Sequence, residues 1–119
     1  MNELSMWGHF VNAMNKFFVF KGRASRKEYW SFVLFYIIFM AIAGLVLGMM
    51  DLPDRVLNSI SYVFLVPSIA VTVRRLHDLN KSGAWYFIQL IPIVGTLYLL
   101  YLMLKPTQQG DNKYGPSLV

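Results

Sequence analysis

The stretch YWSFVLFYIIFMAIAGLVLGMM, residues 29–50, carries no charged side chain. As an α-helix it would be about 33 Å long, slightly more than the roughly 30 Å of hydrocarbon in a bilayer. Its aliphatic and phenylalanine side chains each favour insertion by about 0.3–0.6 kcal/mol. This stretch therefore predicts a transmembrane helix, and it sets the class of the whole chain.

Two more segments, 56–73 and 84–104, are also free of charge. As helices they would be about 27 and 31 Å long, which is enough to span. Only residues 51–55 separate the first two spans, so these helices must be antiparallel neighbours. The sequence predicts an all-α, polytopic membrane protein with three transmembrane helices, 29–50, 56–73 and 84–104.

The composition agrees with a membrane protein. Of 119 residues, 56% are hydrophobic and 14% charged, which is too apolar for a soluble domain of this size. Eight of the eleven lysines and arginines lie in 1–28 and 74–83, beside apolar runs, which is typical of a cytoplasmic membrane surface and not of a nucleic-acid interface. With no cysteine, disulfides and thiolate metal sites are excluded. We expect no cofactor and no nucleic-acid partner.

The positive-inside rule predicts the orientation. It places 1–28 and the basic loop 74–83 in the cytoplasm, and 51–55 and the tail 105–119 outside. The N-terminus is then cytoplasmic and the C-terminus is on the opposite side. An alternative is a re-entrant hairpin broken at Pro92, which would return the tail to the cytoplasm. Each half of that segment would be short, so three spans are preferred.

Residues 1–28 are predicted to form an amphipathic interfacial helix followed by a basic segment. At 100° per residue, His9, Asn12 and Lys16 fall opposite an apolar arc of about 120°. The arc consists of Trp7, Phe10, Val11, Met14, Phe17 and Phe18. Such a helix would lie in the interface plane, and packing against the other helices is the alternative.

Two charged clusters meet on the predicted cytoplasmic side. Ser25 and Glu28 form an S-x-x-E capping box, so the first span begins near Ser25. We interpret the clusters as a site for anionic lipid headgroups or a partner protein, formed by Arg23, Arg26, Lys27, Glu28, Arg74, Arg75, His77 and Asp78. The alternatives are topological anchoring and ion pairs from Glu28 or Asp78 to the arginines of the second cluster.

Other features concern helix packing and chemistry. Gly44 and Gly48 form G-x-x-x-G, where another helix of this chain or of a second copy could pack closely. Pro92 should kink the third span, with Gly95 easing close packing one turn later. His77 beside Asp78 could act as a general base or metal ligand, but no other ligand cluster accompanies it.

Four ordered motifs resemble the YhaH/YhaI-like family of small bacterial inner-membrane proteins, a domain of unknown function (805). The first, F-x-G-R-x-S-R-x-E-Y-W, is carried by Phe20, Gly22, Arg23, Ser25, Arg26, Glu28, Tyr29 and Trp30. The second, R-R-L-H-D-x-x-x-S-G, is carried by Arg74, Arg75, Leu76, His77, Asp78, Ser82 and Gly83. P-x-x-G and the tail G-x-N-x-Y-G follow at Pro92, Gly95, Gly110, Asn112, Tyr114 and Gly115. The resemblance implies a polytopic inner-membrane protein and no established reaction.

The chain departs from the family at 79–81, where Leu-Asn-Lys replaces T-x-R, and at Ala84, where many members have tryptophan. The sequence therefore indicates a non-enzymatic inner-membrane protein that is structural or binds lipid headgroups or a partner. An oligomeric channel or transporter component is the alternative, although no Asp, Glu, Lys, Arg or His lies within a span. An enzyme acting on a lipid headgroup through His77 and Asp78 is a further alternative.

Overall fold

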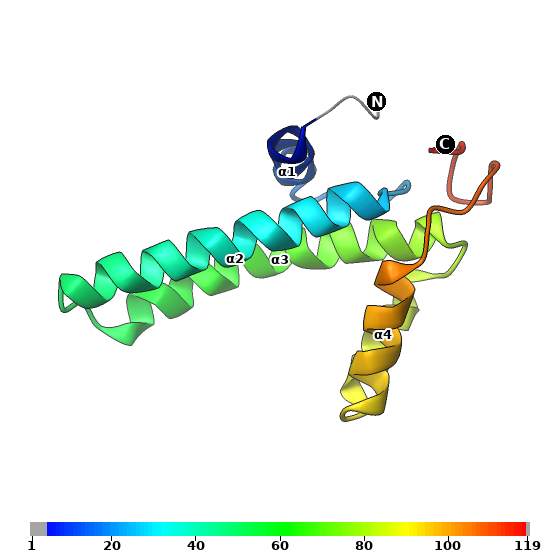
Figure 1. Ribbon diagram of the computed structural model, residues 1–119. Helices are drawn as coiled ribbons and strands as arrows, with labels where there is room; N and C mark the ends of the chain where they lie inside the picture. Colours follow the sequence, from blue (N-terminus) through cyan, green and yellow to red (C-terminus); the bar gives the residue numbers. More distant parts are fainter. Residues whose placement is uncertain (1–4, 119) are drawn as a thin grey trace.

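The computed structural model describes residues 5–118, and within them the regular structure is helical (Figure 1). The elements are α1 (Met6–Asn15), α2 (Arg26–Met49), α3 (Asp54–Asp78), the 3₁₀ helix η1 (Gly83–Leu90) and α4 (Val94–Leu104). The predicted all-α class is confirmed for this part of the chain.

Helices α2 and α3 form a long antiparallel hairpin (Figure 1). They have 24 and 25 residues and are long and apolar enough to cross a membrane. Many of their apolar side chains face outward, with Leu45 66% exposed and Val63 58% exposed. An apolar surface this extensive needs an apolar environment. The predicted helices at 29–50 and 56–73 are thus present. Both extend further at the end of the hairpin where α2 begins and α3 finishes, which we call the charged end.

The third apolar segment is not one helix, so the prediction of a single helix over 84–104 is wrong. The chain reverses between η1 and α4 in a γ-turn, in which the Val94 amide donates to the Pro92 carbonyl at 2.7 Å. Ile93 at its centre has a φ of 65°. Pro92 favours a break in the helix at this point, because it offers no amide proton and its ring excludes a helical carbonyl four residues earlier.

The returning helix α4 packs directly on the backbone of η1 at Gly95. A Cβ atom at Gly95 would lie 1.8 Å from the Ile88 carbonyl oxygen, so only glycine fits. With 8 and 11 residues, the two arms are about 16 Å long, half of a hydrocarbon core. The η1–α4 hairpin projects sideways from the charged end of α2 and α3 (Figure 1).

The reversal places the tail beside the start of α2. The Trp30 indole donates to the Met103 carbonyl at 2.9 Å, and Arg26 donates to the Leu104 carbonyl at 3.0 Å. The expectation that the tail 105–119 lies across the membrane from the N-terminal basic segment is therefore wrong. The physical reason is that the third apolar segment turns back before it can cross.

Helix α1 crosses the first turns of α2 (Figure 1). The ring centres of Trp7 and Phe35 are 5.3 Å apart, and Phe10 stacks on Phe32. The predicted apolar arc is only partly formed, because the helix ends at Asn15, before Phe17 and Phe18. His9, expected on the polar face, is buried against the other helices.

The two glycines of G-x-x-x-G have different surroundings. A Cβ atom at Gly44 would meet the Leu57 side chain at 3.7 Å, so this position packs against α3. At Gly48 a Cβ atom would meet nothing within 4 Å. Of these two glycines, only Gly44 therefore lies against another helix of the chain.

The contact at Gly95 predicts a large effect of Gly95→Ala. Overpacking typically destabilises by about 1–3 kcal/mol, and here the obstructing atom belongs to the backbone, so we expect the upper end of that range. Gly48→Ala is the matched control, because Ala adds up to about 1 kcal/mol of helix propensity in open space. Denaturant titration of the protein in micelles, followed by circular dichroism, gives both free energies of unfolding. Equal stabilities for the two variants would contradict the close packing at Gly95.

Candidate functional site at the charged end

Asp78, the last residue of α3, is fully buried and holds the charged end together. Its Oδ1 accepts from Nε of Arg23 at 2.9 Å, and its Oδ2 accepts from Arg75. All three side chains are at most 1% exposed. One carboxylate therefore forms ion pairs with two arginines from separate parts of the chain.

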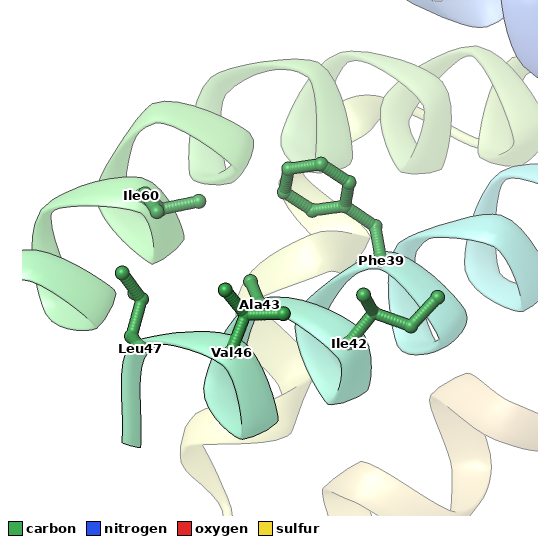
Figure 2. Close-up of a pocket in the computed structure, with 6 residues that line it drawn as sticks. All are labelled: Phe39, Ile42, Ala43, Val46, Leu47 and Ile60. Carbon is green, nitrogen blue, oxygen red and sulfur yellow. The ribbon is translucent and has the colours of Figure 1, made fainter. Parts of the chain in front are cut away.

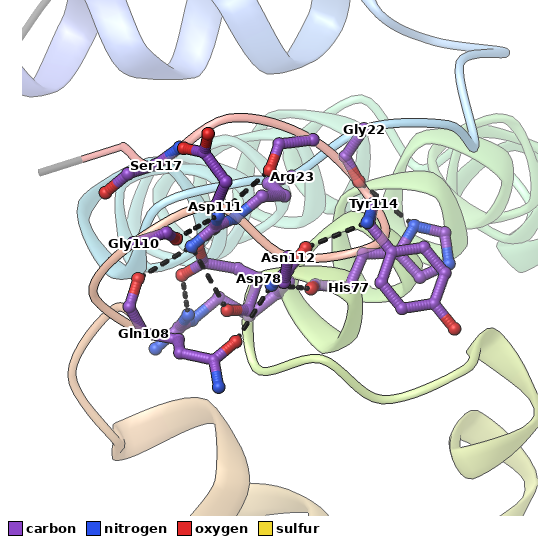
Figure 3. A network of polar contacts seen from close by, with 12 residues as sticks. Gly22, Arg23, His77, Asp78, Gln108, Gly110, Asp111, Asn112, Tyr114 and Ser117 are labelled. Carbon is purple, nitrogen blue, oxygen red and sulfur yellow. Dashed lines mark hydrogen bonds and ion pairs between the residues drawn. The ribbon is translucent and has the colours of Figure 1, made fainter.

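Arg23 also binds the tail (Figure 3). One terminal nitrogen donates to the carbonyl of Gln108 at 2.7 Å, and the other donates to the carbonyls of Gly110 at 2.9 Å and Gly115 at 3.3 Å. Its Nε already pairs with Asp78. Every nitrogen of the guanidinium group is thus engaged inside the protein, which joins the loop before α2 to α3 and to the tail.

A second buried pair joins the first turn of α2 to α3, one turn before Asp78. Glu28 accepts from Arg74 at 2.7 Å, and Nε of Arg74 donates to the Val19 carbonyl at 3.1 Å. The Ser25 hydroxyl accepts from the Glu28 amide at 3.0 Å, so this half of the predicted capping box is present. The other half is absent because the Glu28 carboxylate turns to Arg74. The predicted ion pairs from Glu28 and Asp78 to the second cluster are both formed.

His77 lies beyond the uncharged part of α3 and packs against the tail. Its ring stacks on Tyr114 with centres 4.0 Å apart, and its Nδ1 lies 3.0 Å from the Gly22 carbonyl oxygen. Burial lowers the pKa of His77, and the hydrogen bond to Gly22 opposes that shift. Protonation of the imidazole is therefore less favourable than in a free histidine, and its Nδ1 proton is assigned to the bond with Gly22. Arginines occupy both oxygens of Asp78, so this carboxylate does not orient His77 as the general-base alternative would require.

The tail closes on itself as it meets α3. Asn112 donates to the His77 carbonyl at 3.1 Å and accepts from the Tyr114 amide at 2.9 Å. Asn112 and Gly115 also exchange two backbone hydrogen bonds. The acceptors for Arg23 are backbone carbonyls, which every residue carries, so residue types alone could not identify them. The only signal was the G-x-N-x-Y-G pattern of the tail.

The exposed part of the predicted cluster is smaller than expected. Arg26 and Lys27 are exposed at the start of α2, beside an open hollow of about 380 Å³. The hollow is lined by Ser25, Arg26, Lys27, Pro106, Thr107, Gln109 and Leu118. Arginines 23, 74 and 75 are buried and paired. The surface that could meet an anionic group is therefore Arg26, Lys27 and the tail beside them.

Two other places carry little chemistry. An apolar groove of about 320 Å³ lies between α2 and α3 near their far end (Figure 2). Its lining is Phe39, Ile42, Ala43, Val46, Leu47 and Ile60, which suits contact with a lipid chain. Among residues 5–118, no three histidine or carboxylate side chains come together as metal ligands.

Removing the negative charge of Asp78, which Arg23 and Arg75 share, should strongly destabilise the fold. Asp78→Asn leaves Arg23 and Arg75 buried without a counter-charge, so we expect a loss of about 3–5 kcal/mol in the free energy of unfolding. Asp54→Asn is the control, because Asp54 is exposed in the first turn of α3 and its helix-dipole interaction is worth only about 0.3–1 kcal/mol. Denaturant titration in micelles measures both. A loss for Asp78→Asn no larger than that for Asp54→Asn would refute the central role of this carboxylate.

Comparison with known proteins agrees with the resemblance seen in the sequence. The family model described as "Protein of unknown function (DUF805)" matches residues 17–116. Inner membrane protein YhaI of Escherichia coli (strain K12) is 38% identical over 109 residues, covering 89% of this chain and 91% of that protein. Inner membrane protein YhaH of the same strain is 36% identical over 113 residues, covering 91% and 93%. No solved structure matches. With two long apolar helices and these relatives, the chain is a bacterial inner membrane protein and belongs to the DUF805 family.

Proposed function

We propose that this protein crosses the inner membrane twice, keeps its charged end in the cytoplasm, and binds anionic lipid headgroups there without catalysing a reaction. The orientation is supported by the distribution of positive charge. With the tail returned to the start of α2, ten of the eleven lysines and arginines lie at the charged end, and Arg55 alone lies at the other. The positive-inside rule favours the cytoplasm for the end with ten.

The observation that supports headgroup binding is that some arginines of the charged end are buried in ion pairs, whereas Arg26 is exposed. Buried arginines are paired with Glu28, Asp78 and backbone carbonyls. Arg26 and Lys27 instead face an open hollow at the first turn of α2, where free backbone amides and the helix dipole add positive potential. Trp30 follows at the depth where aromatic belts form. A lipid phosphate at this level would meet both side chains.

The polar contacts also support a non-enzymatic protein. A general base needs an acceptor that is free to take a proton from a substrate. Both oxygens of Asp78 hold arginines and Oε2 of Glu28 holds Arg74, while Nδ1 of His77 faces the Gly22 carbonyl, so neither carboxylate orients the imidazole as a base. These groups act as structural partners, and headgroup binding by Arg26 and Lys27 requires no proton transfer.

The orientation can be tested with single cysteines, because the chain has none of its own. In intact spheroplasts, a membrane-impermeant maleimide should label Leu52→Cys in the turn between α2 and α3. Ser82→Cys and Lys113→Cys should react only after permeabilisation, because they lie at the charged end. Labelling of Lys113→Cys together with Leu52→Cys in intact cells would contradict two crossings.

Headgroup binding can be measured as lipid selectivity. Spin-labelled phosphatidylglycerol should associate with the reconstituted protein more strongly than spin-labelled phosphatidylcholine. Arg26→Gln combined with Lys27→Gln should reduce that preference, by up to about fivefold per cation, since a cation near an anionic surface contributes about 1 kcal/mol. Arg55→Gln at the far end is the control and should change nothing. An undiminished preference in the double variant would exclude this site.

A further inference from the structure

We propose that the η1–α4 hairpin inserts into one leaflet only, the leaflet at the charged end, and acts as a wedge that draws the protein to membranes where that leaflet is convex. The proposal rests on the two-crossing orientation above. It assigns the lipid leaflet as the binding partner of a surface that the helices α2 and α3 leave uncovered.

The surface of the hairpin is apolar, most strongly at its tip. Leu90 and Ile93 are each 75% exposed, and Val94 is 69% exposed. The adjoining residues Ile91 and Leu97 are exposed as well. Each square ångström of such surface is unfavourable in water by about 25 cal/mol, so the tip favours hydrocarbon.

The backbone of the tip is suited to hydrocarbon too. A turn in lipid must satisfy its own polar groups, because no water can do so. The carbonyl of Ile88 accepts from the Ile91 amide, and the carbonyl of Ile91 accepts from the Gly95 amide. The γ-turn pairs Pro92 with Val94, and proline itself has no amide proton to leave unpaired. Several polar groups of the turn are therefore paired within the hairpin itself.

The base of the hairpin has the side chains of a headgroup region. The Lys81 ammonium lies 4.7 Å from the centre of the Trp85 ring, and the Lys105 ammonium lies 5.9 Å from that of Tyr101. Aromatic rings with lysines beside them are typical of the membrane interface. The bond from Trp30 to the Met103 carbonyl fixes the base at the level where α2 begins.

The direction and length of the hairpin limit it to one leaflet. It projects sideways from the charged end of α2 and α3 (Figure 1), and its arms of about 16 Å are about half as long as a hydrocarbon core is thick, so it stays in the half of the bilayer at that end. In the other leaflet the described chain consists of α2, α3 and their turn. Helix α1, which packs on Phe32 and Phe35 near the charged end, adds to the same leaflet as the hairpin. The protein therefore occupies more area in one leaflet than in the other.

The test uses both orientations of the reconstituted protein. Lys113→Cys carrying a dithionite-sensitive fluorophore is reconstituted into vesicles of mixed size, and dithionite added outside separates molecules with the charged end outward from those facing inward. The outward population should be denser, by about twofold or more, in vesicles of about 50 nm than in those of about 200 nm, since interfacial insertion is sensitive to curvature. The inward population is the matched control and should show the reverse trend.

A second label measures insertion itself. Val94→Cys carrying an environment-sensitive fluorophore should be quenched by lipids with a nitroxide in mid-chain. Equal densities of the two orientations at every vesicle size overturn the wedge, even where Val94 is quenched and the tail remains cytoplasmic. Val94 unquenched, with Lys113→Cys still cytoplasmic in spheroplasts, overturns insertion of the hairpin but leaves the proposed orientation intact. In that case, cross-linking between copies through Val94→Cys would show that a second copy of the protein covers the apolar tip of the hairpin.

Discussion

The pairing of Arg23 with Asp78 and with the carbonyls of the tail is the interaction on which the rest of the structure depends. It joins parts of the chain that are 55 to 92 residues apart. A guanidinium group can donate in several fixed directions at once, which a lysine cannot do. Because the tail must reach Arg23, residues 84–104 must return to the side from which they started. The hairpin between α3 and the tail follows from this requirement.

Burying this much charge is unfavourable unless every charge finds a partner. Removing an ion from water is disfavoured by several kcal/mol, and neighbouring opposite charges offset that loss only when the geometry is good. Here Asp78 serves Arg23 and Arg75, while Glu28 serves Arg74. The result is a rigid polar cluster at the end of an otherwise apolar hairpin. The exposed cations around it are free to act on other molecules.

Patterns within short stretches of sequence predicted those parts of the fold that depend on neighbouring residues. Uncharged stretches of sufficient length gave α2 and α3, and the capping signal at Ser25 gave the start of α2. The spacing of charges also predicted the ion pairs of Glu28 and Asp78. The third segment could not be assigned in this way, because 21 uncharged residues with one proline fit a kinked span as well as a hairpin. The contacts of Arg23 with backbone carbonyls of the tail favour the hairpin over the kinked span. Because every residue has a backbone carbonyl, these contacts could not be predicted from residue types. The burial of His9 likewise depends on where α1 crosses α2.

The long separation between Arg23 and its carbonyl partners bears on how the protein is made. Segments emerge from the ribosome in order, so α2 and α3 can enter the membrane before residues 108–115 exist. During that interval the guanidinium group of Arg23 lacks three of its acceptors. A translation product that stops before Gly110 never acquires them all. The polar cluster at the charged end can therefore close only after residues 108–115 have been made.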